Sequence, residues 1–434
     1  MEAILSIYSL FLAHPAVSTD TRKIPSGSLF FALKGDRFNG NAFAAEALKK
    51  GAAYAIIDEE EYATDDRCLL VDNVLKTLQE LARHHRRVLN PVVIGLTGSN
   101  GKTTTKELMH QVMKAKFNTL ATEGNLNNHI GVPLTLLKLK PEHTHAIIEM
   151  GANKKGDIDE LVTIAEPNLG IITNIGKAHL EGFGGETGVE MGKTELFYFL
   201  FKNRGKVLAS VHEEKVVRHT GKLDVIYYGC NALPKFVSGN FDDARLIHDT
   251  PEIEFELGGK SYTSHLGGVY NFKNILTAIA LGRYFAIEND TIGRQIASYV
   301  PSNMRYQWVE KNSNRYLLDA YNANPDSMTE AIRNFEALEG QSKICILGDM
   351  FELGEASPAE HRKIADLAGS MHFESVLLCG KAFAGVPVTG KHVMQFDSFE
   401  ALQSHYTAAE YRNKTILIKG SRGMQMERLL NENK

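Results

Sequence analysis

The stretch "VVIGLTGSNGKTTTKE", residues 92–107, decides the fold of this chain. Its first half is an apolar run that predicts a buried strand, and the residues from Lys102 onward have helical periodicity. A glycine-rich turn between a strand and a helix is the setting of a phosphate-binding loop, because backbone amides converge there and the helix N-terminus is partly positive. The spacing is shorter than usual, since Leu96 stands where the common pattern has glycine.

We expect this turn to bind the phosphates of a nucleotide. Lys102 would reach the outer phosphates, and Thr103 or Thr104 would hold Mg²⁺. The alternative is a tight glycine turn whose lysine is solvated, but the strand, the glycines, the lysine and the threonines together favour phosphate binding. The expected nucleotide-binding residues of the loop are Gly98, Ser99, Asn100, Gly101, Lys102, Thr103 and Thr104.

Apolar runs alternate with amphipathic segments along most of the chain after Pro91, a pattern typical of parallel sheets covered by helices. A break at "YVPSNMR", residues 299–305, separates two such series. The sequence therefore predicts an α/β protein of three domains. They are a small α/β domain at residues 1–88, a central P-loop-type parallel-sheet domain at 89–303 and a C-terminal Rossmann-like domain at 304–434.

Composition indicates a globular protein that acts on a small molecule. The chain has 434 residues, 43% of them hydrophobic, and its 48 basic and 52 acidic residues give a net charge of −4. Such a balance attracts neither nucleic acid nor an anionic membrane. The four cysteines match no zinc or disulfide spacing, and Glu2 stands where a signal peptide has positive charge. We expect a cytoplasmic monomer with no nucleic-acid partner and no membrane insertion.

Three polar residues follow or accompany the apolar runs of the central series, where ligands of parallel sheets bind. Glu149 ends the run "HAIIE", and a carboxylate there is costly unless it meets a cation, either a metal or a lysine. His179 lies in a loop at the same sheet edge, where a lone histidine is usually solvated. Lys193 lies on an apolar helical face, and by pattern alone it is a surface lysine whose stem packs on the helix.

Taken together, these motifs resemble those of the Mur ligases. The resemblance covers about residues 18 to 426, nearly the whole chain, and its motifs occur in the order and spacing of that family. It also explains the short loop, because the family uses the pattern G-x-x-G-K-[ST]. The motifs are "TGSNGKTTTKE" at 97–107, "EMGANKKGDI" at 149–158, "TNIGKAHLEGFG" at 173–184, "GKTELF" at 192–197, "YNFKNILTAIA" at 270–280, "DAYNANPDSM" at 319–328, "LGDMFELGE" at 347–355 and "KGSRGMQME" at 419–427.

The resemblance implies an ATP-driven amide ligase that joins D-alanyl-D-alanine to UDP-N-acetylmuramoyl-tripeptide through an acyl phosphate. By similarity Lys102 and the loop amides hold the phosphates, while Thr103 and Glu149 bind one Mg²⁺. His179 helps to bind a second Mg²⁺. Lys193 matches the lysine that the family carbamylates, which fits the chemistry because CO₂ turns a cation into an anion.

The resemblance also assigns residues to ATP and to the incoming dipeptide. Asn271 matches the residue that reads adenine, and Arg305 matches an arginine that approaches the transferred phosphate. Asp319 matches the ribose-binding acid. The other residues expected to face the cleft or the nucleotide are Asn274, Asn322, Asn324, Ser327, Asp349, Lys419 and Arg422.

The first domain contains "STDTRKIPSGSLFFALKGDRFNGNAF", residues 18–43, which is similar to the UDP-sugar module of the family. "EGNLNNHIGVP", residues 123–133, resembles the loop that meets the muramoyl-peptide. The chain departs from its relatives at Asn41 and Tyr270, where they commonly have histidine, and at His129, where they often have glutamate. The expected substrate contacts are Asp20, Thr21, Arg22, Lys34 and Arg37, with Asn125, Asn127 and Asn128.

Two other functions are compatible with parts of the sequence. One is a ligase for another Mur step or a folylpolyglutamate-type synthase, against which the UDP-like module and "DAYNANPDSM" both argue. The other is a P-loop regulatory NTPase, which would leave the second α/β series unexplained. Release of ADP that requires both a UDP-muramoyl peptide and a dipeptide separates the ligase from the NTPase.

Overall fold

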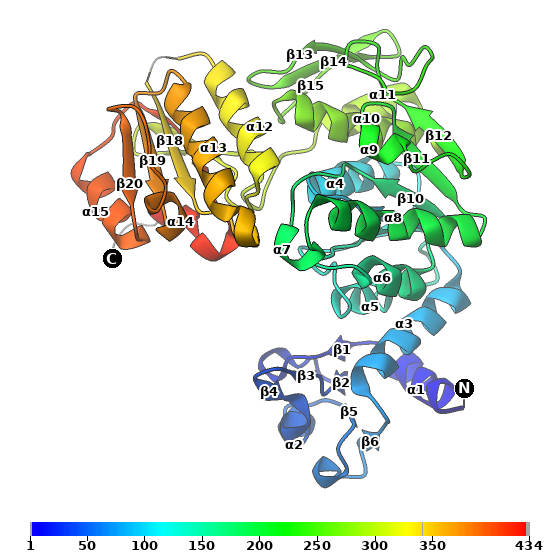
Figure 1. Ribbon diagram of the computed structural model, residues 1–434. Coiled ribbons are helices and arrows are strands. Elements are labelled where there is room, and N and C mark those ends of the chain that lie inside the picture. Colours follow the sequence, from blue (N-terminus) through cyan, green and yellow to red (C-terminus); the bar gives the residue numbers. More distant parts are fainter. Residues whose placement is uncertain (1, 341, 431–434) are drawn as a thin grey trace. The chain divides into compact units, whose positions relative to one another are not determined.

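The structure is a computed structural model that describes residues 2–340 and 342–430. The chain divides into two compact units. The smaller unit contains Met1–Leu96, Phe117–Gly151 and Asp157–Gly170, and the larger contains Thr97–Lys116, Ala152–Gly156 and Ile171–Lys434. Both units have the α/β character that the sequence predicts, with helices and parallel strands alternating along the chain (Figure 1).

The smaller unit begins with a parallel sheet of order β1-β2-β5-β6. Its core forms where Phe30 and Ala32 pack against Ala44, Ala47 and other small or aliphatic side chains. The elements are α1 (Glu2–Ala13), β1 (Val17–Ser18), β2 (Leu29–Phe31), β3 (Lys34–Gly35), β4 (Phe38–Asn39), α2 (Ala44–Lys49), β5 (Tyr54–Ile57), β6 (Cys68–Leu70) and α3 (Val74–Leu89). The apolar start of the chain is therefore a helix.

The second sheet has the strand order β12-β11-β10-β7-β9-β8, and its central strand β7 (Val92–Thr97) is the apolar run of the phosphate-loop motif. The strand leads into α4 (Lys102–Met113), as the sequence predicts. The other strands are β8 (Thr119–Ala121), β9 (His145–Glu149), β10 (Leu169–Ile172), β11 (Lys206–Ser210) and β12 (Asp224–Tyr228). The associated helices are α5 (Gly131–Leu136), α6 (Asp157–Ala165), α7 (Leu180–Phe183), α8 (Glu186–Lys202), α9 (Glu214–Val217), α10 (Val269–Tyr284) and α11 (Asn289–Ala297).

An antiparallel sheet that is not predicted from the sequence is formed by β13 (Arg245–His248), β14 (Ile253–Leu257) and β15 (Lys260–Ser264). Its central strand alternates buried Ile253, Phe255 and Leu257 with less buried glutamates, which is the period of a strand with one covered face. Helix α11 contacts this sheet.

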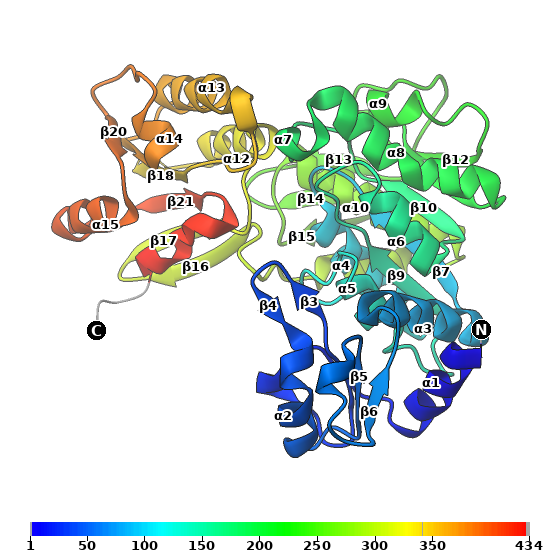
Figure 2. The same ribbon diagram turned by 60° about the horizontal axis from the view of Figure 1, so that its bottom comes forward.

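The last sheet has the order β16-β17-β21-β18-β19-β20, in which only the edge strand β16 runs antiparallel to its neighbour among the described strands. Figure 2 shows the β16–β17 hairpin at its edge. Ile344 and Ile346 of β18 belong to a cluster with Phe399 and Leu402 of α15. The alternate residues of β18 face the other side, where Figure 1 shows α12 and α13.

The strands of this sheet are β16 (Gln307–Lys311), β17 (Asn314–Leu318), β18 (Lys343–Gly348), β19 (Ser375–Cys379), β20 (Val393–Phe396) and β21 (Thr415–Lys419). Its helices are α12 (Pro325–Ala337), α13 (Ser357–Ser370), α14 (Lys381–Ala384) and α15 (Phe399–Ala408). Short 3-10 turns occur at Thr21–Lys23, Gly40–Phe43, Glu60–Tyr62, Gly354–Ala356, Arg422–Met424 and Met426–Leu430. Among the described residues, no helix combines the length and apolar character needed to cross a membrane.

By its charge alone, the run "ARHHRRVLN", residues 82–90, is predicted to be a linker or an exposed helix end, and that prediction is wrong in part. The run is the last part of α3, and Arg86 within it is only 5% exposed. Arg86 Nε donates to the Ala165 carbonyl at 3.0 Å, and its Nη2 donates to the Glu166 carbonyl at 2.8 Å. The buried guanidinium therefore satisfies the carbonyls that α6 leaves free at its C-terminal end.

We predict that Arg86→Met lowers the unfolding free energy of the smaller unit by about 2 kcal/mol, because two buried carbonyls lose their donors. Lys76→Met is the matched control on the same helix, since the Lys76 side chain is 74% exposed. The midpoints of urea unfolding of the two variants measure the difference. Equal midpoints would show that Arg86 is not needed at the end of α6.

Candidate active site

The phosphate loop has a backbone that only glycine can adopt at two places. Gly98 has φ 147° and Gly101 has φ 78°, both in the region that favours glycine. A Cβ on Gly98 would lie 1.9 Å from Oγ1 of Thr173, and one on Gly101 would lie 2.5 Å from Oδ1 of Asn274. The two glycines therefore allow both the turn and the close approach of its neighbours.

Lys102 lies at the first position of α4 and bends back over the loop. Its Nζ donates to the Gly98 carbonyl at 2.7 Å and is 3.3 Å from the Ser99 carbonyl. Thr103 and Thr104 follow in the first turn of the helix and are both buried. The ammonium group and the helix N-terminus thus bring positive charge to the same short loop.

The loop is held by the residues that follow β10, which belong to the motif at 173–184 but have no role predicted from the sequence. The Ser99 N–H donates to the Asn174 carbonyl at 3.0 Å, and the Asn100 N–H donates to Asn174 Oδ1 at 2.9 Å. Thr173 Oγ1 donates to the Asn100 carbonyl at 2.6 Å, and the Gly176 N–H donates to Ser99 Oγ at 2.9 Å. These bonds fix the loop conformation from one side.

Helix α10 packs against α4 and brings two buried asparagines to the loop. Thr105 Oγ1 donates to Asn274 Oδ1 at 3.0 Å, and Asn274 Nδ2 donates to Asn271 Oδ1 at 3.1 Å. The structure thus groups Asn274 with Gly101 and Thr105, and it places Asn271 one helical turn away.

In the smaller unit, Glu149 ends β9 and is 1% exposed. Its Oε1 accepts a hydrogen bond from Asn127 Nδ2 at 2.8 Å, and its N–H donates to Thr122 Oγ1 at 2.9 Å. Asn128 Oδ1 accepts from the Gly131 N–H at 2.9 Å at the start of α5, whereas Asn125 is exposed. The loop at 123–133 and the strand-end carboxylate are therefore neighbours, and the roles expected for them stay predictions.

His179 has a left-handed backbone conformation, with φ 53° and ψ 38°, immediately before α7. Its Nδ1 contacts Oε2 of Glu352, and this interaction holds the pKa of the Glu352 carboxyl below its usual value although burial opposes the shift. Glu352 lies in the motif "LGDMFELGE" and was not among the expected site residues. The histidine is therefore engaged by an acid rather than solvated.

Lys193 is fully buried on α8, so the interpretation from pattern alone, a surface lysine, is wrong. Its Nζ lies 3.4 Å from the Ala152 carbonyl and 5.4 Å from the centre of the Phe183 ring. The periodicity of α8 could not reveal this burial, because the covering groups come from the segment before α6 and from α7.

The start of α12 contacts the phosphate loop. Asn324 and Ser327 form a reciprocal cap: the Ser327 N–H donates to Asn324 Oδ1 at 2.9 Å, and the Asn324 N–H donates to Ser327 Oγ at 3.1 Å. Asn324 Nδ2 also donates to Asn100 Oδ1 at 2.6 Å. Asn322 Oδ1 accepts from the adjacent Ala323 N–H. Two of the expected residues therefore build the helix end that meets the loop.

The other expected residues of the last α/β segment have partners of their own. Lys419 Nζ pairs with Asp319 Oδ2 at 2.6 Å, and Arg422 pairs with Glu427 at 2.7 Å. Asp349 accepts hydrogen bonds from the N–H groups of Ala382 and Phe383, both at 2.9 Å, which caps α14. The substrate role expected for Asp349 stays a prediction, and its observed contacts are structural.

Arg305 stacks on Tyr321, with the guanidinium carbon 3.9 Å from the ring centre. Its Nε is buried without a hydrogen-bond partner in the part of the chain that the structure describes. A buried donor of this kind is costly unless an acceptor reaches it. The arrangement suits an anion that binds beside the ring.

The expected UDP contacts lie at the surface of the smaller unit. Asp20 and Arg22 form a bidentate pair with bonds of 2.8–3.2 Å, which lowers the pKa of Asp20 to about 2. Lys34 pairs with Asp58 at 3.0 Å and with Glu59 at 2.8 Å. Thr21 is partly exposed and Arg37 is exposed. Asn41 is buried and donates to Asp58, so at this position the asparagine stabilises the module.

Comparison with known proteins gives one consistent result. Residues 15–86 match the family model "Mur ligase family, catalytic domain", residues 96–282 match "Mur ligase middle domain" and residues 304–422 match "Mur ligase, glutamate ligase domain". The chain is 34% identical to the UDP-N-acetylmuramoyl-tripeptide--D-alanyl-D-alanine ligase of Bacillus subtilis, over 96% of this chain and 92% of that protein. The Escherichia coli protein of the same name is 35% identical, over 96% and 94%.

Solved structures agree. The crystal structure of MurF from Acinetobacter baumannii has a TM-score of 0.83 and 28% identity, covering 96% of this chain and 92% of that one. MurF ligase from Thermotoga maritima in complex with ADP has a TM-score of 0.81 and 26% identity, covering 96% of both chains.

We predict that Gly98→Ala abolishes nucleotide binding, because a methyl group there collides with Thr173 and the backbone conformation disfavours it. Gly221→Ala is the control, since its added Cβ would meet nothing within 4 Å. Fluorescence titration with a labelled ADP measures both variants. Tight binding by Gly98→Ala would contradict the role of this loop.

Proposed function

The chain belongs to the Mur ligase family, and on that premise we propose that it joins D-alanyl-D-alanine to UDP-N-acetylmuramoyl-tripeptide in peptidoglycan precursor synthesis, with ATP as the energy source. The observation that carries the proposal is the match of nearly the whole chain to ligases of that name. The ADP complex of a similar structure supports the nucleotide. The phosphate loop, braced by Asn174 and Asn324, supplies the corresponding geometry.

The reaction has two steps. A carboxylate oxygen of the tripeptide attacks the γ-phosphorus of ATP, the bond from that phosphorus to the bridging oxygen breaks, and ADP leaves. The amine of D-alanyl-D-alanine then attacks the acyl carbon, the acyl C–O bond breaks, and phosphate leaves as the nitrogen loses a proton. Energy from ATP thus makes a carboxylate oxygen a good leaving group.

In this scheme the chain supplies positive charge where the phosphoryl group transfers. Lys102 and the loop amides bind the phosphates, with Lys102 giving up its contacts to the loop carbonyls. Arg305 approaches the transferred group, and its buried Nε, which has no hydrogen-bond partner among the described residues, supports that role. Phosphoryl transfer depends mainly on such positioning and electrostatic stabilisation. Asn271 and Asp319 are assigned to adenine and ribose.

The residues also fit Mg²⁺, which neutralises phosphate charge when bound. We propose that Thr103 and Glu149 supply oxygen ligands to one ion, since hydroxyl and carboxylate oxygens are the donors that Mg²⁺ prefers. His179 contributes at a second. The burial of Glu149 supports this assignment, because a buried carboxylate needs compensating positive charge.

We propose further that Lys193 is carbamylated. Its complete burial supports the modification, because an ammonium group is costly to bury and the neutral amine is the form that adds CO₂ with loss of a proton. The product is a carboxylate-like anion that can face a cation. The smaller unit would bind the UDP moiety through Arg22, Lys34 and Arg37.

The enzyme is proposed to act in the cytoplasm, where ATP is available. The four cysteines support this compartment, because all of them are free thiols in the structure. The monomeric state expected from the sequence stays a prediction.

We predict that Lys193→Ala is nearly inactive and that acetate restores a small part of the rate, because a free acid loses entropy on binding that a tethered carbamate does not. Lys202→Ala, at the exposed end of the same helix, is the control and should keep the wild-type rate. Independently of activity, enzyme equilibrated with ¹³CO₂ should give a carbamate ¹³C signal that Lys193→Ala lacks. An unmodified amine in an active enzyme would disprove the carbamate.

We predict that ADP release requires ATP, the UDP-linked tripeptide and D-alanyl-D-alanine together. Lys102→Ala should abolish it while the affinity for the UDP substrate stays within about twofold, because Lys102 belongs to the phosphate loop. Lys114→Ala, at the exposed other end of α4, should retain activity. ADP release without the dipeptide would favour an NTPase instead.

A further inference from the structure

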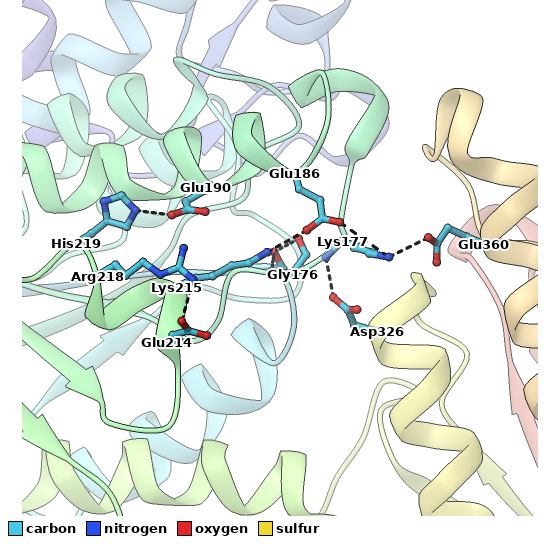
Figure 3. Close-up of polar contacts among 11 residues, drawn as sticks. Gly176, Lys177, Glu186, Glu190, Glu214, Lys215, Arg218, His219, Asp326 and Glu360 are labelled. Atoms are coloured by element: carbon cyan, nitrogen blue, oxygen red, sulfur yellow. Dashed lines mark hydrogen bonds and ion pairs between the residues drawn. The ribbon is translucent and has the colours of Figure 1, made fainter. Parts of the chain in front are cut away.

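Lys177 lies between two carboxylates that come from distant parts of the larger unit (Figure 3). Its Nζ is 2.9 Å from Oε1 of Glu360 on α13 and 4.0 Å from Oε1 of Glu186 on α8. Its backbone N–H donates to Oδ2 of Asp326, in the first turn of α12, at 2.7 Å. One residue of the loop after β10 thus contacts both helices that cover one face of the last sheet.

We propose that Lys177 is a positioning residue for the ligation reaction: its backbone N–H holds the start of α12 beside the phosphate loop, and its ammonium group holds α13, which packs against α12. The inference rests on the proposed function, because it concerns the residues assigned there to ATP and the dipeptide. Lys177 acts through α12 and through the 173–176 loop, and it is not assigned a contact with either substrate.

The first step of the argument is how closely α12 approaches the loop. Oδ2 of Asp326 lies 2.2 Å from the position that a Cβ on Gly176 would occupy, so the carboxylate reaches the backbone only because residue 176 is glycine. Gly176 also holds the phosphate loop, because its N–H donates to Ser99 Oγ and its carbonyl accepts from that hydroxyl. The start of α12 and the phosphate loop therefore share one support.

The second step is that α12 carries the groups to be positioned. Asn324, which caps this helix, donates to Asn100 of the phosphate loop. Ser327 completes the cap, and Asn322 lies two residues before it. A small shift of the helix start would move these side chains relative to the phosphates, and small displacements of reacting groups cost much rate.

The third step is electrostatic. The Glu360 side chain is 9% exposed. Burial alone would raise the pKa of its carboxyl, but hydrogen bonds from Lys363 and Lys177 outweigh burial and lower it. Because Lys363 remains beside Glu360 at 2.8 Å, loss of Lys177 does not leave that charge alone, and the fold should survive the change.

The neighbouring Lys215 offers a matched control. It lies in the same group of charges in Figure 3, and its Nζ pairs with the other oxygen of Glu186 at 3.1 Å. That pair joins α9 to α8, so it does not involve α12 or α13. Replacing either lysine by methionine removes one positive charge and keeps most of the side-chain volume.

The test compares Lys177→Met with Lys215→Met in the full-length enzyme, by ADP release at varied D-alanyl-D-alanine. Lys177→Met should lower kcat/KM for the dipeptide roughly tenfold, the size expected for a coupled, partly buried pair. Lys215→Met should stay within about twofold, and Lys177→Arg should recover most of the loss. The UDP-substrate affinity and the melting temperature should be unchanged in all three.

A double-mutant cycle with Glu360→Gln gives the decisive readout. Lys177→Met combined with Glu360→Gln should lose no more than the poorer single variant, and the rate of both should depend less on salt than that of the wild type. The inference would be overturned if the rate losses of the two single variants multiplied in the double variant. Equal rates for Lys177→Met and Lys215→Met would also overturn it, as would a fall in UDP-substrate affinity equal to the fall in rate. Failure of the wild-type enzyme to release ADP with both substrates would instead overturn the proposed function.

Discussion

The hydrogen bonds of Asn100 are the contacts on which the arrangement of the larger unit depends. Its N–H and carbonyl bond to Asn174 and Thr173 beyond β10, and its side-chain oxygen accepts from Asn324 at the start of α12. Three segments that are far apart in the sequence thus meet at one loop residue. The glycines on either side permit this, because a Cβ on Gly98 would collide with Thr173.

This network has a consequence for catalysis. Hydrogen bonds join the phosphate loop to the loop after β10 and to the start of α12, so these three segments hold one another in place. Preorganised groups cost little reorganisation when charge develops on a transferring phosphoryl group. On the proposed function, nucleotide binding at the loop and dipeptide binding near α12 are therefore expected to depend on each other through Asn100 and Lys177.

The sequence predicted the parts of the fold that depend on local pattern. The strand and helix around residues 92–107 were found because their periodicities differ sharply, and the parallel sheets followed from apolar runs. The family motifs then identified the chain as a ligase. The antiparallel sheet β13–β15 was missed, because its short alternating strands were not distinguished from loops.

What could not be predicted were contacts between distant residues. Asn174 is 74 residues from its partner Asn100, and Lys177 is 183 residues from Glu360. No spacing in the sequence reveals such pairs. The burial of Lys193 and Arg86 was missed for a related reason, since a helical pattern shows which residues share a face but not what covers it. Asp349 follows a strand, as a ligand-binding acid would, but in the structure its carboxylate caps α14.

The central claim is that the energy of ATP activates a carboxylate of the peptide substrate. The most direct measurement uses UDP-linked tripeptide whose reacting carboxylate carries ¹⁸O. The acyl-phosphate route predicts that each ligation transfers one ¹⁸O atom to the released phosphate, detected by mass spectrometry or by the ³¹P shift. Phosphate that contains no label from the substrate, and instead takes its oxygen from water, would contradict the account and show hydrolysis of ATP without carboxylate activation.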